Sequence, residues 1–234
     1  MIHENNGGKS SGNTCSGKSK HYRIAEKAGG ASLILGSLLL TVYAVLFPIL
    51  LPIGNGTYDY VQVVLNPNYV RLAIMAFIGV LSMIAGFYAV YSRLRSRAGL
   101  IGAIGFLFLE AAYLLQACKI TWEVFLYPII AAHPESAFLL RDAIIKHDSA
   151  VVIFRVVSDI TIFIGIVLFC TTLYRSAEYS KAAAALIFVG ALVYAIGPMI
   201  SVFVSVAGIF TLSIGCLLVG VRLFRMQQAS VNSR

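Results

Sequence analysis

Six apolar stretches of this chain are each long enough to cross the hydrocarbon core of a membrane as a helix. They cover residues 28–53, 72–91, 98–118, 150–173, 182–199 and 200–223. An apolar fraction of 59% and a charged fraction of 12% support this interpretation, because soluble domains contain about 25% charged residues. The sequence therefore predicts an all-α fold, a bundle of six transmembrane helices.

The distribution of basic residues predicts the orientation of this bundle, because lysines and arginines in short loops are retained on the cytoplasmic side. With the N-terminus inside, thirteen basic residues fall on the cytoplasmic side and four fall outside. The four outside are Arg71, Lys119, Arg141 and Lys146. We therefore expect a multi-pass protein of the plasma membrane with both termini cytoplasmic. The formal net charge of +8 then reflects topology, and no nucleic-acid partner is expected.

Composition divides the chain into three parts. Residues 1–21 are rich in Gly, Ser, Asn and Lys, which is typical of a disordered cytoplasmic tail. Residues 22–226 form the transmembrane domain, and residues 227–234 form a cytoplasmic C-terminal tail. The stretch 12–19 matches the phosphate-loop pattern G-x-x-x-x-G-K-[ST], but no apolar strand precedes it, so nucleotide binding is not expected.

The outer loop between the third and fourth helices is long and covers residues 119–149. Trp122, Phe125 and Tyr127 are spaced for an aromatic anchor at the membrane interface that continues the third helix. Residues 135–148 are expected to form a short amphipathic helix on the outer surface. Within the apolar stretches, small residues recur at spacings that favour close helix packing in lipid. They include Gly29, Gly36, Gly79, Gly86 and Gly208.

Three ionisable residues lie inside the apolar stretches: Glu110 in the third, and Arg155 and Asp159 in the fourth. A charge at the bilayer centre costs about 2.5–3.5 kcal/mol, so such residues usually face a polar interior and mark a site. Counted from the expected outer ends of their helices, Glu110 and Asp159 lie at similar depth. Arg155 lies one helical turn outward of Asp159. We therefore expect Arg155 to bridge the two acids.

One basic group between two acids leaves a formal charge of −1 in a low-dielectric interior, which is typical of a proton carrier or a cation site. The candidate ligand or ion site consists of Glu110, Arg155, Asp159, Tyr113, Gln116 and Ser158. Two other interpretations stay open: an ion triad that only fixes helix register, and a catalytic site. Catalysis is least favoured, since the sequence has no H-E-x-x-H motif and no nucleophile elbow. No cofactor and no metal ion is expected.

The motifs Tyr22-Arg23-Ile24-Ala25, Asp59-Tyr60-Val61, Asn66-Pro67-Asn68, Phe106-Leu107-Phe108-Leu109-Glu110-Ala111 and Leu173-Tyr174-Arg175-Ser176 follow one another along residues 22–224. In this order they resemble the bacterial and archaeal family of six-helix membrane proteins catalogued as domain of unknown function 4386. The resemblance implies a six-helix topology and a recurrent intramembrane position for Glu110. The chain departs from the family at Leu107, where a basic residue is usual, and at 178–182, where the family has a Pro-Arg-Trp-like motif. Because the family has no established activity, the resemblance implies no function.

Together these features predict an integral membrane protein that binds or transports a small molecule or ion through a polar site in the outer half of the bundle. The alternatives are a structural or regulatory membrane subunit and, third, a membrane-embedded lipid enzyme. A transporter requires a cavity that solvent can reach beside Glu110 and Asp159. A subunit would instead bind a partner through lipid-facing helices. The expected partners are the lipid bilayer, a small-molecule or cation ligand, and a second copy or another membrane protein.

Overall fold

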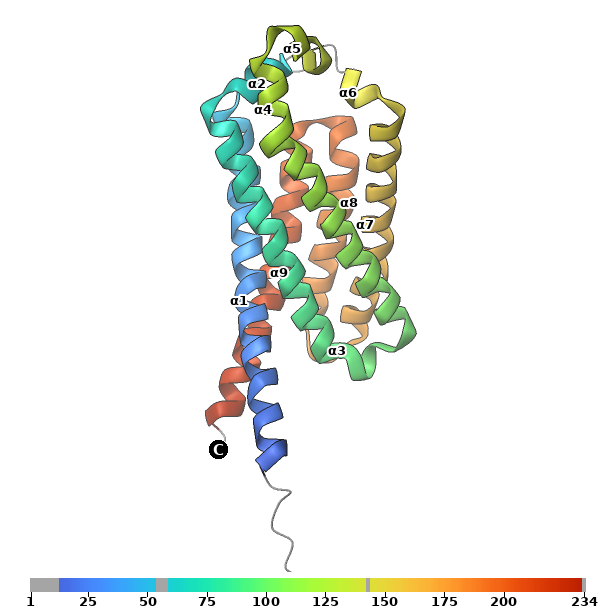
Figure 1. Ribbon diagram of the computed structural model, residues 1–234. Coiled ribbons are helices and arrows are strands. Elements are labelled where there is room, and N and C mark those ends of the chain that lie inside the picture. The colour runs from blue at the N-terminus through green and yellow to red at the C-terminus, as the bar shows by residue number, and fades with distance from the viewer. Residues whose placement is uncertain (1–12, 54–58, 142–143, 233–234) are drawn as a thin grey trace, which may run out of the picture.

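The computed structural model describes residues 13–53, 59–141 and 144–232, and every regular element in these ranges is a helix (Figure 1). The long elements are α1 (Asn13–Leu50), α3 (Pro67–Thr121), α7 (Ser149–Arg175), α8 (Lys181–Ile200) and α9 (Val202–Asn232). The short ones are α2 (Tyr60–Leu65), the π-helix η1 (Trp122–Leu126), α4 (Tyr127–Ala132), α5 (Pro134–Arg141) and α6 (Ile144–His147). The all-α prediction is confirmed for the described residues.

Four segments are long and apolar enough to cross a membrane: Lys27–Leu50, Pro67–Ala132, Ser149–Arg175 and Val202–Met226. A further apolar helix, Lys181–Gly197, is shorter. These lengths and compositions are compatible with an integral membrane protein. The count of six membrane-spanning helices and the orientation of the termini stay predictions.

α3 is a helical hairpin whose two limbs meet at Gly99. Gly99 has φ 58° and ψ −164°, a left-handed backbone conformation that costs a residue with a Cβ atom about 1 kcal/mol or more. The chain reverses there, so the limb before Gly99 and the limb after it run side by side (Figure 1). Tyr91 and Phe106, which stand at nearly equal distances from the bend in sequence, stack with ring centroids 4.2 Å apart. The bend therefore divides Pro67–Thr121 into two antiparallel helical segments.

Both ends of the described chain are more helical than composition indicates. α1 begins at Asn13, so residues 13–21 are helical although the sequence predicts a disordered tail there. Extending an existing helix fixes one residue per added hydrogen bond and avoids the cost of nucleation, so a polar stretch can continue a stable apolar helix. Residues 13–19 of the phosphate-loop pattern are part of this helix, and residues 1–12 lie outside the described residues. α9 likewise continues to Asn232.

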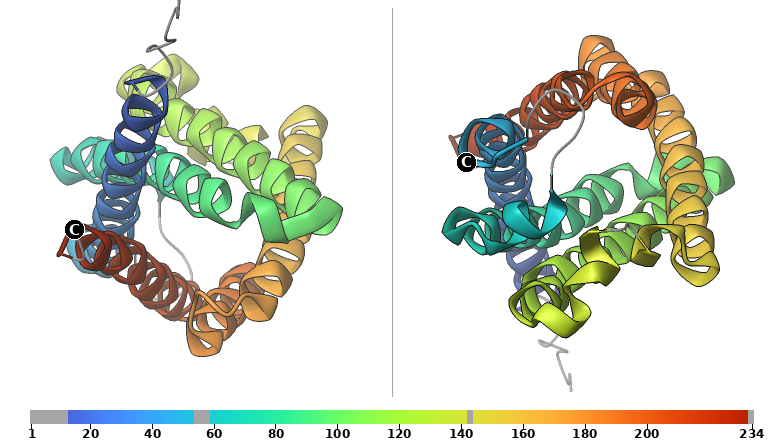
Figure 2. Two further views of the ribbon diagram at one scale, coloured as in Figure 1. Left: turned by 90° about the horizontal axis from the view of Figure 1, so that it is seen from below. Right: turned by 90° about the horizontal axis from the view of Figure 1, so that it is seen from above.

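The long helices surround a common interior, which Figure 2 shows along the bundle axis. α1 packs on α3 and α9, α8 packs on α9, and α7 packs on α3 and α8. Fully buried side chains from these helices form the main core, among them Leu33, Met83, Phe87, Phe169 and Cys216. A second core lies under α2, α4 and α5, and it contains Val63, Tyr69 and Leu140. This second core closes one end of the bundle, which we call the α5 end; the opposite end, which contains the bend, is the Gly99 end.

At the Gly99 end one residue, Glu178, connects α3 and α9 to the segment between α7 and α8. Glu178, between α7 and α8, accepts from Arg93 Nε at 2.8 Å and from Arg97 Nη1 at 3.1 Å, both on the first limb of α3. Arg222 Nε on α9 donates to the Glu178 carbonyl oxygen at 3.2 Å. The Glu178 side chain is 21% exposed, so its charge is only partly screened by solvent. These bonds hold the ends of α3, α8 and α9 together.

Glu178→Gln should lower the free energy of unfolding by about 1 kcal/mol, because an amide keeps the size of the side chain and loses both ion pairs. The loss should shrink as salt is added, since ions screen partly exposed charges. Thermal unfolding in detergent at low and high salt measures both effects. Glu135→Gln is the matched control, because the Glu135 side chain is 79% exposed and its contact with His133 is 3.8 Å long. Equal losses for the two variants would contradict the prediction.

Candidate functional site

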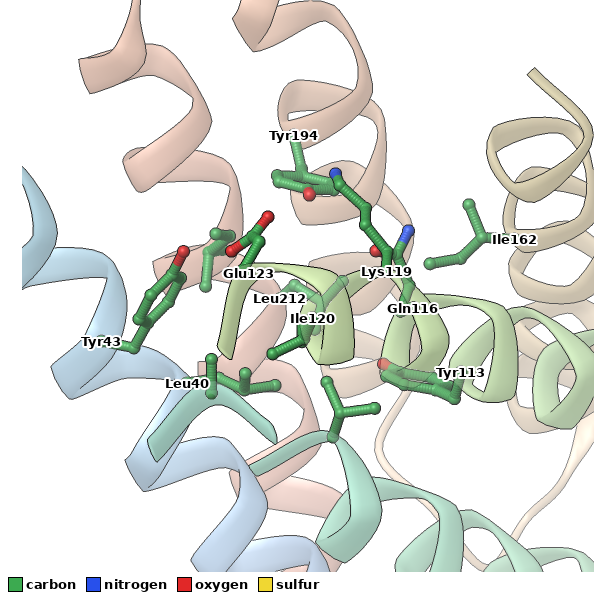
Figure 3. A pocket seen from close by; sticks show the side chains of 13 residues that line it. Leu40, Tyr43, Tyr113, Gln116, Lys119, Ile120, Glu123, Ile162, Tyr194 and Leu212 are labelled. Carbon is green, nitrogen blue, oxygen red and sulfur yellow. The ribbon is translucent and has the colours of Figure 1, made fainter. Parts of the chain in front are cut away.

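A cavity of about 130 Å³ lies inside the bundle toward the α5 end (Figure 3). All the long helices contribute to its wall, so it is a product of the whole bundle. Its lining side chains are Leu40, Tyr43, Ala76, Val80, Tyr113, Gln116, Lys119, Ile120, Glu123, Ile162, Tyr194, Ile209 and Leu212. We call this space the central cavity.

The polar groups of the central cavity lie mostly on one face of α3 and its continuation. Tyr113, Gln116, Ile120 and Glu123 follow one another at intervals of three, four and three residues, the spacing of one helix face. Lys119 lies one turn before Glu123, and Figure 3 shows its side chain reaching toward Tyr194 of α8. Tyr43 of α1 closes the opposite side. One basic group, one acid, one amide and three phenols thus converge in an otherwise apolar interior.

The Lys119 ammonium is the most distinctive group in this cavity. Within the described part of the chain, its nitrogen makes no hydrogen bond and no ion pair at 4.0 Å or less. Glu123 and Asp159 are the carboxylates close enough to act on it electrostatically. The Lys119 side chain is half-buried, and a partly desolvated ammonium without a direct partner gains from an anionic group that hydrogen-bonds to it.

The π-helix η1 positions Glu123. Its defining bond runs from the Tyr127 N–H to the Trp122 carbonyl oxygen, one residue further than in an α-helix. Pro128 follows directly and has no N–H to donate, so the α-helical bond to Val124 cannot form there. A π-turn of this kind rotates the side chains that follow it relative to those before it, and such turns are frequent at functional sites. The third helix thus continues past Cys118 to Ala132, as the aromatic anchor of Trp122 and Tyr127 predicts.

The expected bridge between Glu110, Arg155 and Asp159 does not form. Arg155 and Asp159 are exposed on α7, and among the described residues no ion pair joins Arg155 to either acid. The physical reason is depth. A Cβ atom on Gly165 would lie 2.6 Å from the Leu109 nitrogen, so Glu110 is level with Gly165 rather than with Asp159. Gly165 follows Asp159 by six residues on α7, so Glu110 and Asp159 differ in depth by about 9 Å along the helix axis.

The depth estimate was wrong because it took Cys118 as the outer end of the third helix. The helix continues for fourteen more residues through η1 and α4, so the position of Glu110 relative to the helix end shifts inward. The side chain of Glu110 does not line the central cavity. It lines a separate groove between α1 and the α3 hairpin.

The other predicted site residues have different positions. Tyr113 and Gln116 line the central cavity. Ser158 is buried, but its hydroxyl donates to the Phe154 carbonyl oxygen at 2.7 Å within α7 and so is already satisfied. The structure thus divides the predicted site: two residues line the cavity, Glu110 lines the groove, and the rest lie on α7.

Sequence reasoning missed Lys119, Glu123, Tyr43 and Tyr194. The first two were assigned to the outer loop because the apolar run ends at Cys118. The helical spacing that connects Tyr113 and Gln116 with Glu123 was a signal that could have found them. Tyr43 and Tyr194 lie on distant helices, and only the packing of α1 and α8 against α3 brings them to the cavity.

Within the ranges that the structure describes, no group of three or more His, Cys, Asp or Glu side chains is placed to hold a metal ion. Comparison with protein-family models, with curated proteins and with solved structures found no match.

Proposed function

We propose that this protein is a six-helix membrane protein that binds a small carboxylate-bearing molecule in the central cavity and carries it across the membrane. The observation that supports the proposal is the Lys119 ammonium, which faces a cavity and has no direct ionic partner among the described residues. The resemblance to the six-helix family of unknown function is consistent with the topology that this proposal requires.

A carboxylate is the group that best complements the central cavity. Charge-assisted hydrogen bonds are the stronger ones, and Lys119 can supply one together with the phenol and amide donors of Tyr113, Tyr194 and Gln116. A water molecule needs only about 10–15 Å³ of such space, so 130 Å³ admits a ligand of several heavy atoms.

Two features favour transport over passive binding. The central cavity lies toward the α5 end, while the Glu178 ion pairs join the helices at the Gly99 end. A cavity near one side of a membrane with a polar closure at the other is what an outward-facing transporter requires. The second candidate function, a structural membrane subunit, is favoured by the many large apolar side chains exposed on α3 and α7.

A ligand screen on the purified protein tests the proposal. Small organic acids, amino acids, primary amines and inorganic ions are added at equal ionic strength, and thermal unfolding is followed in a neutral detergent. We expect a carboxylate-bearing compound to raise the Tm, because a ligand that binds only the folded state stabilises it. Uptake of the same compound into liposomes then separates transport from binding. A response to none of these compounds, with tight co-purification of another membrane protein, would favour the subunit.

The orientation can be tested with single cysteines introduced into a variant without native cysteines. Arg95→Cys lies near the Gly99 end and Glu135→Cys lies at the α5 end, and both side chains are exposed. Because basic residues are concentrated at the Gly99 end, we expect a membrane-impermeant maleimide to label only position 135 in intact cells. Labelling at position 95 in intact cells would contradict the proposed orientation.

A further inference from the structure

A groove of about 530 Å³ lies between α1 and the α3 hairpin, apart from the central cavity. Its wall is almost entirely apolar and includes Gly29 and Ser32 of α1 and Leu81 of the first limb of α3. Tyr88, also on the first limb, is 61% exposed. Glu110 on the second limb is the acidic residue among the described residues of this lining.

Glu110 is unsatisfied in this groove. Its Oε1 atom is buried and has no hydrogen-bond partner among the described residues. A buried carboxyl oxygen without a partner is unfavourable, so a ligand that donates to this oxygen or pairs with its charge would bind more tightly. Among the residues whose side chains the structure describes, no lysine, arginine or histidine lines the groove. A cationic ligand would supply the partner that Oε1 lacks among the described residues.

Two aromatic side chains, Tyr88 and Phe106, line the groove together with Glu110. Phe106 lies one helical turn before Glu110 on the same face, and the Tyr88 ring faces it with centroids 6.2 Å apart. Tyr91 stacks on Phe106 with ring centroids 4.2 Å apart. A cation placed near aromatic faces and a carboxylate gains from the ring quadrupoles and from the ion pair together. Leu81 and Ile84 extend the apolar wall beyond the rings.

We propose that this groove is a second binding site, which takes a lipophilic organic cation with its charge at Glu110 and its apolar body along Leu81 and Ile84. A zwitterionic phospholipid fits poorly, because its phosphate would lie near the Glu110 carboxylate, and none of the described lining residues is basic and able to balance it. The ligand therefore carries a positive charge without a negative one. The site shares no lining residue with the central cavity, so it does not depend on what that cavity binds.

Tetraphenylphosphonium and tetraphenylborate are matched probes, because they have nearly the same shape and opposite charge. Equilibrium dialysis of the full-length protein in a neutral detergent should show saturable binding of the phosphonium and none of the borate. Glu110→Gln should weaken phosphonium binding at least about tenfold, since it removes a charged partner and keeps the size of the side chain. Glu123→Gln, in the central cavity, is the matched control and should leave phosphonium binding unchanged.

Glu110→Asp keeps the charge and should retain part of the binding, which separates loss of the carboxylate from loss of folding. Equal binding of the two probes would show that the groove takes any apolar body and would overturn the proposal. Phosphonium binding to Glu110→Gln with the affinity of the wild type would also overturn the proposal. If the phosphonium does not bind and Glu110→Gln changes the oligomeric state on size exclusion, a second copy of the chain covers the groove instead.

Discussion

Gly208→Leu should destabilise the protein by about 3 kcal/mol or more and close the central cavity, because overpacking of a tight interior forces the backbone to move. Gly208 lies where α9 crosses α8. A Cβ atom there would overlap the Tyr194 backbone nitrogen and would lie 2.7 Å from the Tyr194 Cα atom and 2.9 Å from the Gly190 carbonyl oxygen. The contacts are with backbone, so a rotamer change cannot relieve them. Tyr194 lines the cavity and would be displaced with its helix.

The Tm of Gly208→Leu measures the loss of stability, and its affinity for the carboxylate ligand measures the closure of the central cavity. Gly30→Ala is the matched control, since a Cβ atom there has its nearest contact at 3.3 Å, with the Phe224 nitrogen, and requires a shift of only a few tenths of an ångström. The control should unfold within a few degrees of the wild type and bind ligand normally. A Gly208→Leu variant as stable as Gly30→Ala would show that α8 and α9 are less tightly packed than this crossing indicates.

Lys119→Met should weaken binding of the carboxylate ligand about 10- to 100-fold. A hydrogen bond to a charged group is worth about 1.5–3 kcal/mol, and about 1.4 kcal/mol corresponds to a factor of ten in Kd. Methionine keeps most of the length and apolar contact of lysine, so the fold should be retained. Lys119→Arg keeps the charge and should lose less affinity than Lys119→Met.

The control for this variant is Lys181→Met at the start of α8. The Lys181 nitrogen lies 5.3 Å from the centre of the Tyr174 ring and does not line the central cavity. Lys181→Met should leave the Kd of the carboxylate ligand unchanged. Titration calorimetry measures this Kd for Lys119→Met, Lys119→Arg and Lys181→Met. If Lys119→Met bound the carboxylate as tightly as the wild type, the ammonium would serve only to reach the aqueous interface, and the proposed ligand class would be wrong.

The positions of helices were largely predictable from the sequence, because each depends on a local run of apolar residues. The expected helix 150–173 corresponds to α7, and the expected boundary near residue 98 corresponds to the bend at Gly99. Gly36 and Gly79 were expected at close helix contacts, and a Cβ atom on Gly36 would lie 2.9 Å from the Gly79 carbonyl oxygen. Helix ends were less predictable. α3 continues through η1 and α4 because aromatic and polar residues can extend a helix beyond its apolar run.

The end of the third helix, expected at Cys118 and found at Ala132, determines which residues form the candidate site. Placing the end of the third helix at Cys118 put Glu110 level with Asp159 and left Lys119 and Glu123 in a loop. A charged residue near a membrane surface has no local signal that tells whether it points to solvent, to lipid or to the interior. The direction depends on which helices pack beside it. For Glu110 the neighbours are α1 and the first limb of α3, and for Lys119 they include α8.

The sequence by itself determined the all-helical class and most helix positions, since both follow from short-range patterns of apolar and small residues. Only the tertiary structure decided which polar groups meet, because contacts between residues as distant as Tyr43, Glu123 and Tyr194 depend on the crossing of whole helices. The same packing separated Glu110 from Arg155 and Asp159. A helix rotates about 100° per residue, so an error of one or two residues in register turns a side chain from one neighbour to another.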